Sequence, residues 1–387
     1  MPAPTPPSRV AQRNSINGSN PLPGRCPRPF FELIRLRQTN STSSPACLDG
    51  SPPVYFLRNG EGADARKLFV ALQGGGWCES PQKCDAWKQR SSKRIDGATC
   101  QHAPHDANAA YEGAEGILSP RASTSRFYGW AVAYFYYCDG GMFLGTQAKP
   151  GQGAHGPQYY RGAFNLKAAL HDVVRRVRPT ELVLGGCSAG GIAALSHCER
   201  VSALMSKHGV SVRCIVDAAL FPAVTFDAVI DLMVARASLP RACVDAEQSN
   251  WRRCVHGRYS LLHSSTPTFV INSVFNWRSN AAPSAYRDLM LRSLSPALNA
   301  SSAHGAFASS CDVHCEGSRH WRQVRINRLT MRHAVERWYF DGSVEKHLDP
   351  NPAPNGNPDC LQTFATKLQH LEGSVTNWVE DRVARLG

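Results

Sequence analysis

The stretch ELVLGGCSAGG, residues 181–191, joins a short apolar run to a glycine-rich turn with a serine at its apex. It fits the pattern G-x-S-x-G, in which Gly186 and Gly190 flank Ser188 at a sharp strand-to-helix turn. Such a turn, the nucleophile elbow, holds the serine hydroxyl at the carboxyl end of a central sheet. Glycines flank the serine because only glycine tolerates the close backbone contacts there. The stretch therefore predicts a strand, a strained turn and a helix around a nucleophilic serine.

The residues after the turn, 192–198, are predicted to form a helix whose N-terminal amides face Ser188. The positive end of a helix dipole stabilises negative charge that develops beside it, as on an oxyanion. Glycine-flanked serines also occur in ordinary loops, but this one has the strand before it and the helix after it that an elbow requires. We therefore predict that Ser188 is the nucleophile of an esterase-type hydrolase.

Apolar runs and stretches of helical periodicity alternate along the rest of the chain. Alternation at this spacing is typical of a mostly parallel sheet that helices cover on both faces, so the predicted fold class is α/β. The main predicted strands are residues 54–57, 67–72, 130–137, 212–216 and 268–272, and the main predicted helices are 161–177 and 331–339.

The domain organisation follows from composition. Residues 1–45 are rich in proline, serine and asparagine, and we expect a flexible leader there. Residues 46–387 contain neither an internal repeat nor a clean linker, so a single domain is expected. Residues 79–125 are polar and are expected to form an irregular excursion held by cysteines. No signal-peptide core is visible in residues 1–20, and no apolar stretch reaches the roughly 18 residues of a membrane helix.

The composition is that of a globular protein with a basic surface. Apolar residues make up 42% and charged residues 19% of the 387 residues, which supports a sizeable core. The net charge of +13 fits an anionic polysaccharide, an acidic cell wall or nucleic acid. Nucleic-acid binding is not expected, because the sequence has no zinc finger, RNP-like segment or periodic basic helix. The arginines are scattered, so a solvated surface also explains the charge.

The fourteen cysteines are an even number, which is typical of a disulfide-bonded protein from an oxidising compartment. Cys243 and Cys254 are expected to close a local excursion. No pair has C-x-x-C spacing, so a structural zinc site is not expected. Sequons at Asn17, Asn40 and Asn299 are compatible with a secreted glycoprotein.

A serine becomes a good nucleophile only with a base beside it. His314 is the candidate, because Cys311 and Cys315 flank it and a disulfide-anchored loop can hold a base within about 3 Å of a hydroxyl. A surface histidine without a catalytic role is the alternative. The glycine run 74–76 follows the strand 67–72, where esterases build an oxyanion hole from backbone amides; an ordinary tight turn is the alternative.

Several segments of the chain, in the same order, resemble the pectin acetylesterase family, which also includes the more distant Notum carboxylesterases. The similarity covers roughly residues 46–342, and the cysteine before the serine brings the chain closer to the pectin acetylesterase branch. The segments are 47–52 (CLDGSP), 74–78 (GGGWC), 116–119 (GILS), 137–140 (YCDG), 186–191 (GCSAGG) and 338–340 (WYF).

This resemblance implies an α/β-hydrolase fold with a serine triad and with neither a metal nor an organic cofactor. It places the nucleophile at Ser188 and the base at His314, because residues 310–315 (SCDVHC) are similar to the S-C-x-x-H-C segment of the family. It assigns the oxyanion hole to the amides of Gly76, Trp77 and Ala189.

The acid of the triad is the position at which the chain departs from the family. The family has an aspartate in a segment like N-P-A-Y-D-F-W, and the matching stretch NSVFNW, residues 272–277, has Asn276 there. In serine proteases, aspartate to asparagine lowers kcat by about 10⁴-fold, because a neutral amide supports the imidazolium poorly. The enzyme is then weak or inactive, or Asn276 suffices, or another carboxylate substitutes. Asp217 is the first substitute candidate, although the resemblance favours a structural role for it, and Asp312 is the second.

Together these observations imply a serine carboxylic-ester hydrolase that removes O-acetyl groups from an acidic polysaccharide such as pectin through an acyl-enzyme. The expected partner is an acetylated, anionic polysaccharide, and the expected location is outside the cell or in the cell wall; the oligomeric state is not predicted. One alternative is a Notum-like carboxylesterase that removes a fatty acyl group from a protein. The other is a carbohydrate-binding homologue that is weak or inactive because of Asn276.

Overall fold

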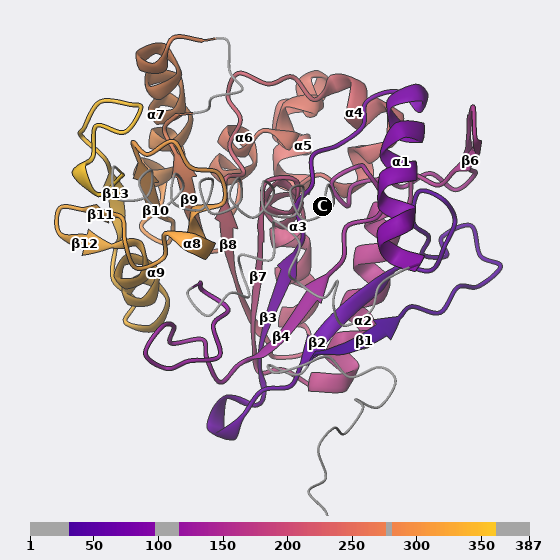
Figure 1. The fold of residues 1–387 in the computed structure, drawn as a ribbon, viewed down its shortest axis with the longest axis horizontal. Helices are drawn as coiled ribbons and strands as arrows, with labels where there is room; N and C mark the ends of the chain where they lie inside the picture. The colour runs from indigo at the N-terminus through magenta and orange to yellow at the C-terminus, as the bar shows by residue number, and fades with distance from the viewer. Residues whose placement is uncertain (1–30, 97–115, 276–280, 361–387) are drawn as a thin grey trace, which may run out of the picture.

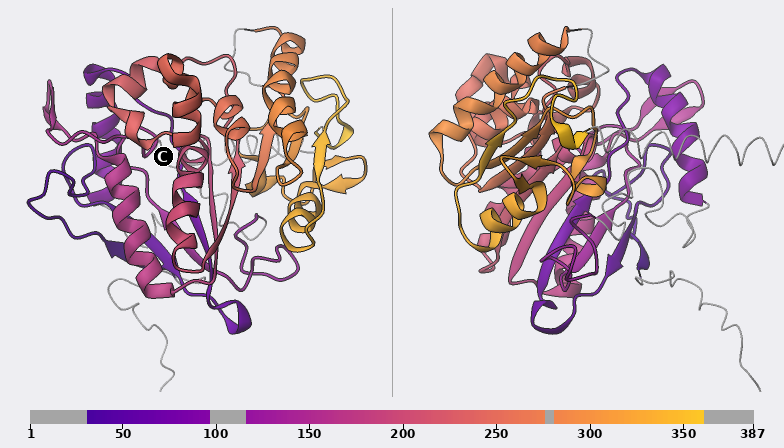
Figure 2. Two further views of the ribbon diagram at one scale, coloured as in Figure 1. Left: turned by 180° about the vertical axis from the view of Figure 1, so that it is seen from behind. Right: turned by 60° about the vertical axis from the view of Figure 1, so that its left-hand side comes forward.

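The structure is a computed structural model that describes residues 31–96, 116–275 and 281–360. Within these residues the chain forms a nine-stranded sheet with helices on both faces (Figures 1 and 2). In order across the sheet, the strands are β1 (Glu32–Arg35), β2 (Val54–Arg58), β4 (Ala131–Phe135), β3 (Lys67–Leu72), β7 (Glu181–Cys187), β8 (Ser211–Asp217), β9 (Thr268–Ser273), β10 (Gly305–Ser309) and β13 (Lys346–Leu348).

Helices and two short ribbons complete the described part of the chain. The ribbons pair β5 (Gly151–Gly153) with β6 (Gly156–Gln158) and β11 (Arg325–Ile326) with β12 (Leu329–Thr330). The α-helices are α1 (Pro81–Asp96), α2 (Gly162–Val177), α3 (Ala189–Ser206), α4 (Asp227–Leu232), α5 (Arg241–Glu247), α6 (Gly257–Leu262), α7 (Pro283–Ala300), α8 (Glu316–Arg319) and α9 (Met331–Phe340). The 3-10 helices are η1 (Gly62–Asp64), η3 (Ala235–Ser238) and η4 (Gln248–Val255).

The strands from β4 to β13 run parallel, whereas β2 runs in the opposite direction and pairs antiparallel with both of its neighbours, β4 and the edge strand β1. The carboxyl ends of parallel strands meet at one edge of a sheet, and this is where ligands bind in open α/β sheets. In the register of the sheet, Cys187 at the end of β7 pairs with Asp217 at the end of β8. Ser273 and Ser309 pair in the same way at the ends of β9 and β10. The loops after these strands therefore lie together.

The central strand β3 shows why the sheet is buried on both faces. Leu68, Val70 and Leu72 belong to the core that includes the apolar residues of α2 and α3. Phe69 and Ala71, between them in the chain, belong to a second core that includes the apolar residues of α9. Helices α2 and α3 cover one face of the sheet, as the left panel of Figure 2 shows. An unbroken apolar run is typical of such a two-sided strand, and the predicted mostly parallel α/β fold is confirmed.

Two predictions about individual segments are wrong. Residues 32–35, placed in the flexible leader, form β1 and pair with β2, because Leu33 and Ile34 pack into the cores. Residues 81–96, placed in an irregular excursion, form α1, which turns Cys84 and Trp87 inward. Its remaining residues are mostly polar, which hid the helix. Parts of both segments, residues 1–30 and 97–115, lie outside the described residues.

Six disulfides join cysteines within the described ranges. The predicted closure of a local excursion by Cys243 and Cys254 is confirmed, and a cysteine pair also holds the start of α1. No helix in these ranges is long and apolar enough to cross a membrane. Cys26 and Cys100 lie outside the described residues. The pairs are Cys47–Cys138, Cys78–Cys84, Cys187–Cys315, Cys198–Cys214, Cys243–Cys254 and Cys311–Cys360.

A buried carboxyl group, that of Asp139, organises the turn after β4. Its Oδ2 accepts hydrogen bonds from the amides of Gly141 at 3.0 Å and Phe143 at 3.1 Å. Burial raises the pKa of Asp139 from 3.8 to about 7, and the two amide bonds offset only part of this effect. The folded protein therefore holds a proton on Asp139 between these pH values, where the unfolded chain releases it.

We expect this proton to make folding less favourable as the pH rises from about 4 to about 7. Replacing Asp139 with Asn removes the titration. The free energy of unfolding of Asp139→Asn, relative to wild type, should therefore rise through this window by up to about 1.4 kcal/mol per pH unit. Urea denaturation at several pH values measures the difference, with the exposed Asp245→Asn as the control. A difference that stays constant from pH 4 to 7 would contradict the assignment.

Candidate active site

Ser188 lies at the turn between β7 and α3, where the backbone is strained. Its φ of 58° and ψ of −124° are rarely adopted by residues that carry a Cβ. The Ser188 amide donates to the carbonyl of Asp217 at 2.9 Å, and the Ile192 amide donates to the carbonyl of Ser188 at 2.9 Å. The predicted sequence of strand, strained turn and helix is confirmed.

The glycines around Ser188 allow three backbone segments to touch. A Cβ at Gly190 would lie 2.0 Å from the carbonyl oxygen of Leu72, at the end of β3. A Cβ at Gly74 would lie 2.5 Å from the carbonyl oxygen of Cys187 and 3.1 Å from the Cβ of Ser188. Real Cβ atoms do not come this close to backbone, so the elbow and the loop after β3 require glycine at both positions.

Ser188 and His314 line the same pocket, which has a volume of about 470 Å³. Within the residues that the structure describes, Ser188 Oγ forms no hydrogen bond, so the two side chains are neighbours without a direct bond. Such catalytic bonds are often long before substrate binds and tighten in the complex. The lining residues are Gly76, Trp77, Ser188, Ala218, Leu220, Phe221, Ala223, Val224, Asn272, Ser273, Phe275, Ala281, Tyr286, Asp312, Val313 and His314.

A disulfide joins the chain neighbours of Ser188 and His314. Cys187 and Cys315 are bonded across a sequence separation of 128 residues. A ring nitrogen of His314 lies within 4.8 Å of both sulfur atoms. The His314 side chain is exposed, and its ring centroid is 6.1 Å from that of Phe221. The loop that carries the candidate base is therefore tied covalently to the elbow.

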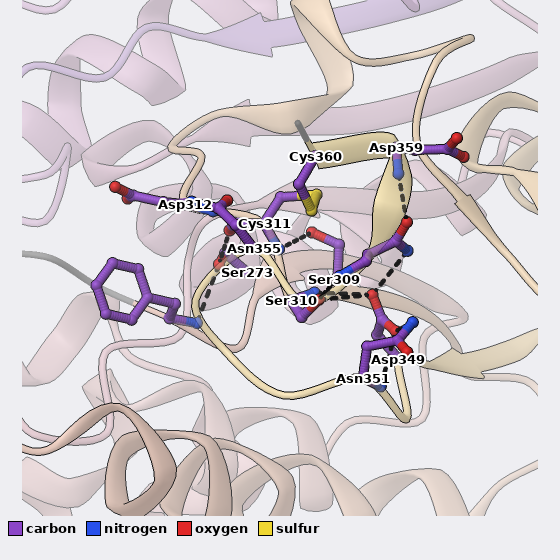
Figure 3. The surroundings of a disulfide bond; sticks show 12 residues. Ser273, Ser309, Ser310, Cys311, Asp312, Asp349, Asn351, Asn355, Asp359 and Cys360 are labelled. Carbon is purple, nitrogen blue, oxygen red and sulfur yellow. Dashed lines mark hydrogen bonds between the residues drawn. A yellow bond between two sulfur atoms is a disulfide. The ribbon is translucent and has the colours of Figure 1, made fainter. Parts of the chain in front are cut away.

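The start of the same loop is anchored by the disulfide Cys311–Cys360 and by polar contacts (Figure 3). Ser310 donates both its amide and its hydroxyl to Asp349 Oδ2, each at 3.0 Å. The hydroxyl of Ser273, at the end of β9, donates to the carbonyl of Cys311 at 2.5 Å. These contacts hold residues 310 and 311 against two strand ends, so little freedom is left to the loop before His314.

The three backbone amides predicted to form an oxyanion hole lie at the pocket or next to Ser188. Gly76 and Trp77 line the pocket, and Ala189 is the first residue of α3, next to Ser188. Within residues 31–96, 116–275 and 281–360, none of these three amides donates to a protein acceptor. Amides that lie at a pocket and have no protein acceptor can donate to a ligand oxygen, as an oxyanion hole requires. Gly76 has a φ of 73°, which favours glycine.

The candidate acids differ in the contacts that their side chains make. Asp217 is buried; its Oδ1 accepts from the Glu316 amide at 3.2 Å and its Oδ2 from the Gly317 amide at 2.7 Å. Both oxygens thus hold the start of α8, directly after the loop of the candidate base. Asp312 lines the pocket. Asn276 lies outside the described residues.

One set of possible metal ligands lies at the site, formed by Cys187, His314 and Cys315. Metal ions bind thiolates, and the two sulfurs of this set are bonded to each other. In this disulfide form the residues present do not fit a metal centre.

Sequence reasoning did not recognise three residues that shape the site. Tyr137 contacts the loop that follows β3, residues 73–78, through its hydroxyl, and its place in the YCDG segment was a signal that could have pointed to it. Asp349 holds the start of the loop that carries the candidate base. Glu316 is a buried carboxyl whose pKa is raised well above its usual range by burial and by the nearby Asp217. Asp349 and Glu316 left no signal, because their roles depend on contacts that local patterns do not encode.

Comparisons with known proteins show which proteins the chain is similar to. The family model described as Pectinacetylesterase matches residues 30–282 and 276–361. The chain is 28% identical to pectin acetylesterase 7 of Arabidopsis thaliana over 378 residues, covering 84% of this chain and 92% of the relative. It is 22% identical to the palmitoleoyl-protein carboxylesterase NOTUM of Schmidtea mediterranea, covering 89% of this chain and 70% of the relative. The solved structure of the Wnt deacylase Notum from Drosophila superposes with a TM-score of 0.69 at 21% identity, covering 85% of this chain and 99% of that one.

Proposed function

Because this chain belongs to the pectin acetylesterase family and is a carboxylic-ester hydrolase, we propose that it removes O-acetyl groups from an anionic polysaccharide such as pectin. The observation that carries the proposal is the placement of the strained Ser188 in one pocket with His314 and with the open amides of Gly76 and Trp77. These two residues lie on the loop after β3, residues 73–78, which we call the oxyanion loop. The net charge of +13 complements an anionic polymer.

In the proposed reaction, Ser188 Oγ attacks the acetyl carbonyl carbon while His314 accepts the hydroxyl proton. The amides of Gly76, Trp77 and Ala189 hold the negative oxygen of the tetrahedral intermediate. His314 then gives its proton to the departing sugar oxygen, which leaves as a hydroxyl group, and acetyl-Ser188 remains. Water, deprotonated by His314, attacks this ester, and acetate leaves as Ser188 recovers its proton.

For the third member of the triad we propose Asn276, by its place in the sequence after β9. Asp217 is proposed as a structural anchor, because both of its carboxylate oxygens already hold amides of α8. An asparagine carbonyl can orient the imidazole but adds no negative charge to stabilise the imidazolium. The proposal therefore includes a lower turnover than an aspartate at this position would allow.

A Notum-like activity on longer acyl groups is the second candidate, because much of the pocket lining is apolar. Leu220, Phe221, Val224 and Phe275 all face the pocket, whose volume of about 470 Å³ exceeds the needs of an acetyl group. The proposed polysaccharide substrate assigns part of this space to the sugar that carries the acetyl group.

The chain-length preference on p-nitrophenyl esters separates the two. We expect kcat/KM for the acetate ester to exceed that for the octanoate ester by about tenfold or more, because the proposed function assigns the space beyond the acetyl group to the sugar and not to a longer acyl chain. The protein should also release acetate from acetylated pectin, as measured by an enzymatic acetate assay. A preference for octanoate would favour the Notum-like activity. Hydrolysis no faster than that of Ser188→Ala would favour a non-catalytic carbohydrate-binding protein.

We also propose that the protein acts outside the cell, as a single domain after a short leader. Six disulfides among the described residues fit an oxidising compartment. The sequon residues Asn40 and Asn299 have exposed side chains, as glycosylation requires, and Asn17 lies outside the described residues.

A further inference from the structure

The hydroxyl of Tyr137 contacts the oxyanion loop, and it acts both as a hydrogen-bond donor and as a hydrogen-bond acceptor. It donates to the carbonyl of Gly76 at 2.8 Å and accepts from the amide of Met142 at 2.9 Å. The side chain is 4% exposed, so water does not compete for these bonds. A phenol that both donates and accepts cannot rotate away without losing one of the two bonds.

The same residue contacts the loop along its length. The Tyr137 amide donates to Oε1 of Gln73, the residue before the glycine run, at 2.8 Å. A Cβ at Gly75 would lie 3.0 Å from Cδ1 of Tyr137, so the ring lies against the middle of the run. On its other sides the ring packs on Trp87 and Phe143, with centroid distances of 5.2 and 5.3 Å. The ring therefore supports the loop from a fixed position.

The geometry of the peptide bond carries this support to the pocket. In a planar trans peptide the C=O and the following N–H point in opposite directions. Because the Gly76 carbonyl points to the buried Tyr137 hydroxyl, the Trp77 N–H points away from it. Gly76 and Trp77 line the pocket, and the Trp77 amide has no acceptor within the described residues.

We propose that Tyr137 is a positioning residue for catalysis, which fixes the Gly76–Trp77 peptide so that the Trp77 amide faces the oxyanion. The proposal rests on the proposed function, because it assigns the Trp77 amide to the oxyanion hole. Burial raises the pKa of Tyr137 well above its usual range, so its hydroxyl stays protonated over the working pH. The donor to the Gly76 carbonyl is therefore present throughout.

Tyr137→Phe removes the hydroxyl and keeps the ring. We expect kcat for p-nitrophenyl acetate, per Ser188 titrated with a fluorophosphonate, to fall by about 10- to 100-fold. This is less than the 10²- to 10³-fold cost of losing an oxyanion donor, since the Trp77 amide remains but is less well aligned. A trifluoromethyl ketone, which forms a tetrahedral oxyanion adduct with the serine, should lose affinity by a similar factor. A competitive product analogue that forms no oxyanion should bind as before.

Tyr55→Phe is the matched control, because it also removes a buried hydroxyl, which donates to Asp172 at 2.6 Å, away from the pocket. Both variants should lose thermal stability, but only Tyr137→Phe should lose kcat and ketone affinity. Wild-type kcat in Tyr137→Phe would overturn the proposal, and so would equal losses of kcat in both variants. If Tyr137→Phe does not fold, 4-fluorophenylalanine is placed at position 137, because it keeps the shape of the side chain but has no hydroxyl to donate. The same results for kcat and ketone affinity then support or overturn the proposal. Wild-type protein without esterase activity would refute the proposed function instead.

Discussion

Replacing Ser188 with alanine is expected to lower kcat/KM for p-nitrophenyl acetate by about 10⁴-fold or more, with little change in stability. Loss of the nucleophile in a serine triad removes covalent catalysis altogether, and only binding and the oxyanion hole still contribute to the rate. The Ser188 side chain makes no hydrogen bond within the described part of the chain, and its strained backbone does not depend on the hydroxyl. Steady-state kinetics and thermal unfolding of the same preparation measure the two quantities.

Ser196→Ala is the matched control for this variant. Ser196 lies on α3, two turns after the elbow, and its buried hydroxyl also has no hydrogen-bond partner in the described residues. It should keep wild-type kcat/KM. Retention of more than about a tenth of the activity in Ser188→Ala would contradict the assignment of the nucleophile, because no serine triad tolerates that loss.

The second large effect is a gain in kcat, and it concerns the acid position of the triad. Asn276→Asp is expected to raise kcat by about tenfold or more, with about 10⁴-fold as the upper limit set by the reverse change in serine proteases. The new carboxylate stabilises the imidazolium of His314 and therefore raises its pKa. The lower limb of the pH–kcat profile, which reports this pKa, should shift to higher pH. Kinetics from pH 5 to 9 measure both effects.

Asp217→Asn and Asp312→Asn are the controls for the two other carboxylates. Asp217→Asn should destabilise the fold, because one of the two amide bonds to α8 is lost, while the folded fraction keeps kcat within about tenfold of wild type. Asp312→Asn should leave kcat nearly unchanged. No gain in Asn276→Asp, together with a loss of about 10⁴-fold in Asp217→Asn, would show that Asp217 is the acid.

Features that depend only on residues close together in the chain could be predicted from the sequence. The elbow needs an apolar strand, two glycines and a helix in order, and all of these lie within residues 181–198. The helix α2 has strong apolar periodicity and ends before Pro179, so its bounds were also predictable. Local patterns report local structure well because each element is built from neighbouring residues.

Features that depend on distant partners could not be predicted in the same way. Strand β1 has four residues, and it became visible only through its pairing with β2. The bond between Cys187 and Cys315 joins residues 128 positions apart, and a list of cysteines does not fix their pairing. The role of Asp217 is also non-local, because its side chain meets amides a hundred residues further along the chain. The sequence pointed to Asp217 but could not show that its carboxylate accepts hydrogen bonds from amides of α8.

The central claim is that Ser188 is a nucleophile activated in the folded site, and covalent labelling tests it most directly. A fluorophosphonate probe should add one label per chain, with mass spectrometry placing it on the peptide that contains Ser188. Labelling should be abolished by unfolding and by Ser188→Ala, and should be slowed strongly by His314→Ala. Failure of the folded wild-type protein to react, or labelling on a different serine, would contradict the account.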